Sequence, residues 1–351
     1  MVIELPRKTY RNVIVSDEIL EKVNPENMKI VNRYLRNFDT KRSDKSVVVK
    51  RSDFNIFLCW NYLYNDNKLI TDIKKIELLD YFDFGVTELG WGTARFNSMH
   101  SSLNTLFNYI VNFLDEIYPQ FHNYMGSIEK PKKTFKREKT VLSEAQVESL
   151  IKYLSFDKKT LQQLTYLLLA IGSGMRISEV LQMQTDLIDE SNLAFGDNFL
   201  KTTRKIRTKG FGKEGAPKYK YIYKDLFLPV YKEWLTVREE ILKEKGLDHN
   251  YIFIKANGEP ATSEVINYWL RKWEKYLSED IETNPKLEPV DLYAHCFRHY
   301  IVTYLTRQGI SKELIVAIIG WASDSMYDTY NDCEEDERQY IDLEKLGGVF
   351  K

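Results

Sequence analysis

The chain has 351 residues, of which 43% are hydrophobic and 29% are charged, and its formal net charge is −1. This length and composition predict a globular protein of two ordinary domains and exclude a disordered chain. A nearly neutral charge does not by itself indicate a nucleic-acid binder, so the positions of the charges matter more than their sum. The three cysteines, Cys59, Cys296 and Cys333, lie far apart, which gives no disulfide framework and favours a reducing, cytoplasmic setting. The most apolar stretch, residues 164–171, is too short to cross a bilayer, so we expect no membrane partner.

Apolar periodicity predicts helices in the N-terminal third of the chain. Residues 54–64 are rich in apolar and aromatic side chains. From Thr93 to Ile117 apolar side chains recur every three or four positions, and Pro119 follows. Because proline disrupts a helix interior, we expect the second of these helices to end before Pro119.

The composition changes sharply between residues 130 and 139, where six basic residues accompany a single acid. Such a change is typical of an interdomain linker, and a solvated tether would have the same composition. The sequence therefore predicts three parts: a helical domain at 1–128, a basic linker at 129–141 and a second domain at 142–351.

The second domain begins with signals for two helices. Ser143 and Gln146 have the spacing of a capping box ahead of an apolar helical face, and Thr160 and Gln163 repeat that spacing. The second helix should end at the glycines of the IGSGM sequence, the last of which is Gly174.

The rest of the second domain predicts a small sheet followed by further helices. Residues 193–228 have the pattern of strands and turns, and tyrosine and lysine alternate within 218–224 as in a strand with two different faces. A helix is expected at 229–245, with Pro229 near its start and Gly246 after its end. Three more helices are expected at 263–277, 295–308 and 311–320.

Three separated segments of the second domain carry residues suited to phosphodiester chemistry. They are residues 174–179 (GMRISE), residues 295–299 (HCFRH) and residues 320–330, where Gly320-Trp321 precedes Tyr330. A pentacoordinate phosphorane gathers negative charge on its non-bridging oxygens, which the permanently charged, forked guanidinium group binds best. Histidine and lysine are suited to carry protons at such a site, and a tyrosine beside cations is a suitable nucleophile.

Each of these residues, taken singly, has an ordinary structural explanation. Arg176 could simply pair with Glu179 three residues later, and Trp321 alone is typical of a protein core. His295 and His299 have the spacing of a zinc-binding helix, but Cys296 stands where that motif has glutamate, which argues against a metalloprotease.

Together, the strings GSGMRISEVLQM, AHCFRHYIVTYLTRQG and IIGWASDSMYDTY resemble the tyrosine recombinase (phage integrase) family of site-specific DNA recombinases. The family pattern has Arg in a Gly-x-Arg-x-x-Glu box, then His-x-x-Arg-His, then Gly followed by His or Trp, and Tyr ten residues after that Gly. The resemblance implies a mainly α fold with a small β-sheet or hairpin in the catalytic domain. It implies a helical core-binding domain that clamps DNA at 1–128 and an α+β catalytic domain at 142–351.

The resemblance also implies a role for each matching residue. Arg176 and Arg298 would bind the scissile phosphate, and His295 would help to move the proton of the nucleophile. Tyr330 would attack the DNA and form a 3′-phosphotyrosine link, with Tyr327 as the competing candidate one helical turn earlier. The remaining matches are Trp321, which would pack and donate one hydrogen bond to phosphate, Glu179, which would support Arg176, and His299, which would be structural.

The family also places a general-acid lysine on a β-hairpin. Residues 201–224 hold nine lysines and arginines and one acid, and Lys209, before a turn, is the first candidate. Lys213 is the alternative, because this hairpin is longer than the family pattern, and a solvated basic strand would have the same composition. The basic residues implied as DNA contacts are Lys130, Lys132, Lys133, Lys136, Arg137, Lys139, Arg204, Lys205, Arg207 and Lys213.

As a whole, the resemblance implies a DNA strand-transfer enzyme that needs neither cofactor nor metal. It implies double-stranded DNA as the partner and a tetramer on paired sites, formed from a monomer or dimer, with room for an accessory directionality factor. Two alternatives stay open. One is a catalytically silent DNA-binding regulator on the same fold, and the other is a topoisomerase-like enzyme that relaxes DNA without paired sites.

Overall fold

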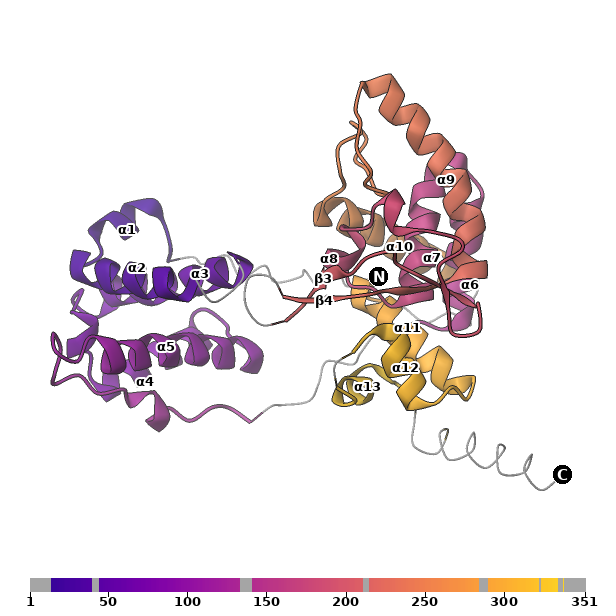
Figure 1. Cartoon of the computed structure of the whole chain (residues 1–351). Coiled ribbons are helices and arrows are strands. Elements are labelled where there is room, and N and C mark those ends of the chain that lie inside the picture. Colours follow the sequence, from indigo (N-terminus) through magenta and orange to yellow (C-terminus); the bar gives the residue numbers. More distant parts are fainter. Residues whose placement is uncertain are drawn as a thin grey trace. The chain divides into compact units, whose positions relative to one another are not determined.

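The computed structural model describes residues 14–39, 44–132, 141–210, 215–283, 290–321, 323–333 and 337. The described residues divide into two compact units, one up to residue 132 and the other from residue 141 onward (Figure 1). This division lies inside the segment expected as a linker, while the DNA-clamping role of the first unit stays a prediction. Across the described residues, no helix is both long and apolar enough to cross a membrane.

The described part of the N-terminal unit is helical, as its periodicity predicts. Its elements are α1 (Asp17–Lys22), α2 (Pro25–Asp39), α3 (Asp44–Tyr64), the 3-10 turn η1 (Ile70–Asp72), α4 (Lys75–Thr87), α5 (Thr93–Phe113) and the 3-10 turn η2 (Tyr124–Ser127). α5 begins at the expected residue but ends before the expected Ile117, because Leu114 already has a non-helical φ of −125°. α3 packs against α1, α2 and α5, and its apolar run forms the centre of this unit's core.

The C-terminal unit is built around one helix that is buried along most of its length. α7 (Leu161–Ser173) packs against α6 (Glu144–Ser155), α9 (Lys224–Lys245) and α11 (Ala294–Arg307). Its residues from 164 to 173 are all buried. The segment that follows, which begins at Gly174, therefore starts in the interior of the unit. The other helices are α8 (Ile177–Val180), α10 (Ser263–Thr283), α12 (Lys312–Ile319) and α13 (Ser325–Tyr330), with 3-10 turns η3 (Lys158–Thr160) and η4 (Thr185–Leu187).

Two small antiparallel sheets lie between α8 and α9 in sequence. β1 (Leu193–Ala194), β2 (Phe199–Lys201) and β5 (Tyr221–Tyr223) form one sheet in the order β1-β2-β5, with Leu200 opposite Ile222. β3 (Ile206–Thr208) and β4 (Ala216–Lys218) form a separate hairpin, with Thr208 opposite Ala216. The mainly helical fold with a small sheet and hairpin is thus confirmed.

The β3–β4 hairpin narrows in a way that only glycine permits. Gly215 has a φ of +63°, and a Cβ at this position would lie 2.2 Å from the carbonyl oxygen of Thr208. A Cβ at Gly210 would lie 2.6 Å from the backbone nitrogen of Ala216. The two backbone segments therefore approach each other closely just beyond Lys209, where a side chain on either glycine would not fit.

Helix starts in this unit include one confirmed and one wrong prediction. Ser143 and Gln146 form the expected capping box at α6. Thr160 does not cap α7, because its hydroxyl donates instead to the carbonyls of Leu154 and Asp157 at 2.7 and 2.6 Å. The side chain of Gln163 accepts a hydrogen bond from the indole of Trp273 at 2.9 Å, so it does not reach back to the helix start.

α9 begins at Lys224 and not at the expected Pro229, which lies inside the helix. Proline so near a helix N-terminus removes few hydrogen bonds, because the first four backbone N–H groups have no intrahelical partner. Asp225 in the first turn and buried Phe227 favour the earlier start. The end at Gly246, with a left-handed φ of +65°, is as expected.

Candidate active site

The first candidate arginine is positioned by the end of α7. Gly174 ends this helix in the left-handed region, with a φ of +61°, and Arg176 is the N-cap of the short helix α8. The backbone N–H of Arg176 donates to Oε2 of Glu179 at 3.1 Å, and its Nη1 donates to Oε1 at 3.0 Å. The pairing of Arg176 with Glu179 is therefore real, and it fixes the guanidinium in place.

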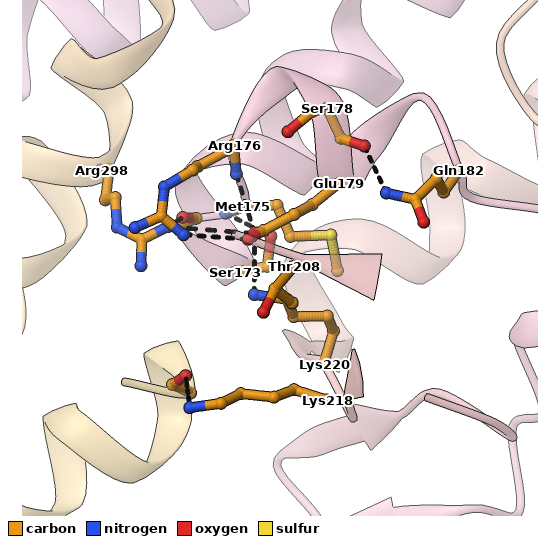
Figure 2. Close-up of polar contacts among 12 residues, drawn as sticks. Ser173, Met175, Arg176, Ser178, Glu179, Gln182, Thr208, Lys218, Lys220 and Arg298 are labelled. Carbon is orange, nitrogen blue, oxygen red and sulfur yellow. Dashed lines mark hydrogen bonds and ion pairs between the residues drawn. The ribbon is translucent and has the colours of Figure 1, made fainter. Parts of the chain in front are cut away.

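Glu179 is completely buried and lies among three cations (Figure 2). Besides Arg176, it receives Nζ of Lys220 at 2.7 Å from Oε2, and Nη1 of Arg298 lies 4.0 Å from the same oxygen. Burial alone would raise the pKa of the Glu179 carboxyl, but Lys220, the Arg176 backbone and Arg298 together lower that pKa below 4.5. Glu179 is therefore ionised at neutral pH and holds the cations together.

Arg298 on α11 is buried, with 1% of its surface exposed. Its Nη1 donates to the carbonyl oxygen of Gly174 at 2.8 Å, which joins α11 to the end of α7. Its Nε and Nη2 have no hydrogen-bond partner among the described residues. Burial and the nearby charge of Arg176 lower the pKa of Arg298, which stays protonated at neutral pH. Two buried donors of a permanent cation are thus free to bind an anion.

The aromatic ring of Tyr330 lies against these free donors. The Arg298 guanidinium lies 5.2 Å from the ring centroid of Tyr330 and 5.2 Å from that of Trp321. The two rings stack on each other, with centroids 5.4 Å apart and planes inclined by 23°. The indole Nε1 of Trp321 is buried and also lacks a hydrogen-bond partner among the described residues. The predicted nucleophile, Trp321 and Arg298 therefore form one cluster.

His295 lies at the start of α11, with its ring centroid 6.2 Å from that of Tyr330. Its side chain is exposed at the surface of the unit. Reduced hydration of the ring and the positive charges of Arg176 and Arg298 lower the pKa of His295 below 6.5. The imidazole is consequently neutral at pH 7, which is the form that can accept a proton.

His299, one turn further along α11, is buried and holds the segment that follows Tyr330. Its Nδ1 lies 2.7 Å from Oδ2 of Asp332, and its ring centroid lies 4.8 Å from that of Tyr330. The backbone N–H of Asp332 also donates to the hydroxyl of Thr303 at 3.0 Å. These contacts suit the structural role expected for His299.

Tyr327, the competing candidate, points its hydroxyl into a different environment. The hydroxyl lies 2.9 Å from Oγ1 of Thr306 and accepts a hydrogen bond from Nδ2 of Asn331 at 3.0 Å. Both partners are buried. Since the hydroxyl of Tyr327 is bonded into the core, the geometry favours Tyr330 as the nucleophile.

The lysines of the hairpin region have different surroundings. Lys209 is exposed at the end of β3, and Lys213 lies outside the described residues. Lys220 is buried on Glu179, and Nζ of Lys218 donates to the carbonyl of Gly320 at 2.8 Å, next to Trp321 (Figure 2). Sequence reasoning missed both of these contacts. For Lys220 a signal existed, because it has the same strand parity as buried Ile222.

The candidate DNA contacts fall into three groups. Lys130, Lys132, Lys205 and Arg207 are exposed. Arg204 is half exposed and forms an ion pair with Asp186 at 2.9 Å. The others, Lys133, Lys136, Arg137, Lys139 and Lys213, lie outside the described residues.

Comparison with known proteins gives a consistent result. The model of the phage integrase family matches residues 140–337. Tyrosine recombinase XerC of Staphylococcus haemolyticus is 22% identical over 267 residues, which are 74% of this chain and 70% of that protein.

Solved structures extend the similarity of fold to nearly the whole chain. The Tn1549 transposon integrase in complex with transposon right end DNA has a TM-score of 0.66 at 16% identity, over 92% of this chain and 99% of that one. A lambda integrase tetramer bound to a Holliday junction has a TM-score of 0.60 at 16% identity, over 87% of this chain and 77% of that one.

Proposed function

This chain belongs to the phage integrase family and is thus a tyrosine-type recombinase that cleaves and rejoins DNA, and we propose that Tyr330 is its nucleophile. The observation that carries the assignment is the cluster around Arg298. Two buried guanidinium donors, without hydrogen-bond partners among the residues that the structure describes, lie beside the ring of Tyr330, and Glu179 fixes Arg176.

We propose a cleavage step that gives these residues, and Lys209, the roles that the family resemblance implies. The phenolic oxygen of Tyr330 attacks the scissile phosphorus and forms a 3′-phosphotyrosine bond, while the bond to the 5′-oxygen breaks. The proton of the phenol moves toward neutral His295, and the leaving 5′-oxygen takes a proton from Lys209 on the hairpin. Arg176, Arg298 and the indole N–H of Trp321 bind the non-bridging oxygens as their charge grows.

Rejoining is the same step in reverse with a different 5′-hydroxyl. Because the phosphotyrosine bond retains the energy of the phosphodiester, no nucleotide hydrolysis is required. We propose double-stranded DNA as the substrate, a tetramer on paired sites and a cytoplasmic location. The tetramer proposal is supported by the fold shared with lambda integrase, which was solved as a tetramer on a Holliday junction.

Recovery of bound DNA under two conditions tests the proposal. The purified protein and its Tyr330→Phe variant are each mixed with fragmented DNA from the organism that encodes the chain. Bound fragments are recovered once after native washing and once after denaturation in SDS. We expect defined fragments to survive SDS with the unmodified protein and not with the variant, because only a covalent phosphotyrosine withstands denaturation.

Other outcomes would favour the alternatives. Defined fragments that appear only in the native pool, with both proteins, would favour a catalytically silent DNA-binding regulator. SDS-resistant complexes without preferred fragments, together with relaxation of supercoiled plasmid, would favour a topoisomerase-like enzyme.

A further inference from the structure

Lys220 is a buried cation that the proposed mechanism does not use. It lies one residue before β5, and 2% of its surface is exposed. Its backbone is held on both sides by Thr202, which accepts from the Lys220 N–H at 3.0 Å and donates its own N–H to the Lys220 carbonyl at 2.9 Å. A charge buried this deeply is costly unless it has a specific partner.

That partner is Glu179, which Arg176 and Arg298 also approach. The distances of these cations from the two carboxylate oxygens show which of them pairs with each oxygen. Nζ of Lys220 lies 2.7 Å from Oε2, while Nη1 of Arg298 lies 4.0 Å from the same oxygen. The guanidinium of Arg176 contacts the other oxygen at 3.0 Å, and its backbone N–H donates to Oε2 at 3.1 Å. Of the two side-chain cations near Oε2, Lys220 is therefore the one in direct contact with it, and Arg298 is held further away (Figure 2).

We propose that Lys220 is a positioning residue for DNA cleavage, which neutralises Oε2 of Glu179 and so leaves the guanidinium of Arg298 free for the scissile phosphate. Three cations share one carboxylate, so the cluster keeps an excess of positive charge for the incoming phosphate. Without Lys220, the carboxylate would draw Arg298 toward itself and away from Trp321 and Tyr330. This inference rests on the proposed function, since it takes Arg298 to be a phosphate ligand.

The test compares Lys220→Met with Lys220→Arg and with a matched control, Lys232→Met. Lys232 also pairs with a glutamate at 2.7 Å, but both side chains of that pair are 55% exposed. The readout is the single-turnover rate of covalent complex formation at saturating DNA, with DNA affinity and thermal unfolding measured on the same samples.

We expect Lys220→Met to slow cleavage by about 10- to 100-fold at little cost in DNA affinity, in the range seen when a residue that orients a site is removed. Lys220→Arg should recover part of the rate, and Lys232→Met should cleave at the unmodified rate. A Lys220→Met variant that is folded and cleaves at the unmodified rate would overturn the inference. A wild-type protein that forms no covalent complex would instead overturn the proposed function.

A second background keeps the test valid if Lys220→Met fails to fold. In a Glu179→Gln protein there is no carboxylate charge left to neutralise, so adding Lys220→Met should cause no further loss of cleavage rate. An additional loss of tenfold or more in that background would show that Lys220 acts independently of Glu179, which contradicts the inference.

Discussion

The two neighbouring tyrosines of α13 differ in what their hydroxyls do. Tyr327→Phe removes a hydroxyl that is bonded to buried Thr306 and Asn331, so we expect the free energy of unfolding to fall by about 1–2 kcal/mol. SDS-resistant DNA complexes should still form. Tyr330→Phe should abolish these complexes and leave thermal unfolding almost unchanged. The reverse pattern would make Tyr327 the nucleophile.

His295 gives a prediction for pH dependence. Its pKa is lowered below 6.5, so the neutral, proton-accepting form is lost as the pH falls below that value. We expect titration of His295 to leave kcat/KM for cleavage unchanged above pH 7. Below that pH, kcat/KM should decline in proportion to the fraction of His295 that is neutral. In His295→Asn the overall rate should be low and this acid limb should disappear. If kcat/KM still declines in acid in His295→Asn, the decline is caused by the titration of another group.

The same shift affects folding in the same direction. Because the folded state binds a proton at His295 less readily than the unfolded state does, this group's contribution to stability is present above pH 6.5 and is lost as the pH falls below it. The charged and titratable groups that set this balance are Arg176, Arg298, His299 and Glu179.

At the level of elements, two glycines with the same conformation have different surroundings. Gly174 and Gly246 both end helices in the left-handed region. An added Cβ at Gly246 meets nothing within 4 Å, whereas one at Gly174 would lie 2.7 Å from Cδ1 of Ile319. We expect Gly246→Ala to cost about 1–2 kcal/mol of stability from strain alone, and Gly174→Ala to cost about 1–3 kcal/mol more.

Cleavage separates these two variants further. The carbonyl of Gly174 binds Nη1 of Arg298, so a shift of this turn moves a proposed phosphate ligand. Gly174→Ala should therefore slow covalent complex formation in the fraction that stays folded, and Gly246→Ala should not. The rate is measured as the formation of SDS-resistant DNA, and chemical denaturation gives the fraction of each variant that is folded. Equal rates per folded molecule for the two variants would contradict a link between the Gly174 turn and cleavage.

Much of the element pattern could be predicted from the sequence, and the failures have identifiable physical causes. Helices with a buried apolar stripe, such as α5 and α6, follow from periodicity. The start of α7 could not be predicted, because the hydroxyl of Thr160 bonds to carbonyls of the preceding turn. Lys220 was missed because a lysine in a basic run is normally solvated, and only tertiary packing brings Glu179 to it.

On the scale of the whole molecule, a net charge of −1 means that DNA affinity must come from local basic surfaces. Exposed Arg207 on β3 is one such candidate. The logarithm of DNA affinity falls linearly with the logarithm of salt concentration. We expect Arg207→Gln to make this negative slope shallower by about 0.9, the value for one phosphate contact. Lys275→Gln, which removes an exposed lysine that pairs with Glu279, should leave the slope unchanged. Equal changes in both variants would point to overall charge instead.

The buried donors of Arg298 and Trp321, which have no partner within the described part of the chain, also affect stability. Each buried donor without a partner costs a folded protein about 1–3 kcal/mol. A chain selected only for folding, or only for binding DNA elsewhere on its surface, would become more stable by replacing these side chains. Their presence is therefore the expected cost in stability of a site that keeps donors ready for an anion, and filling it with an anion should stabilise the folded chain.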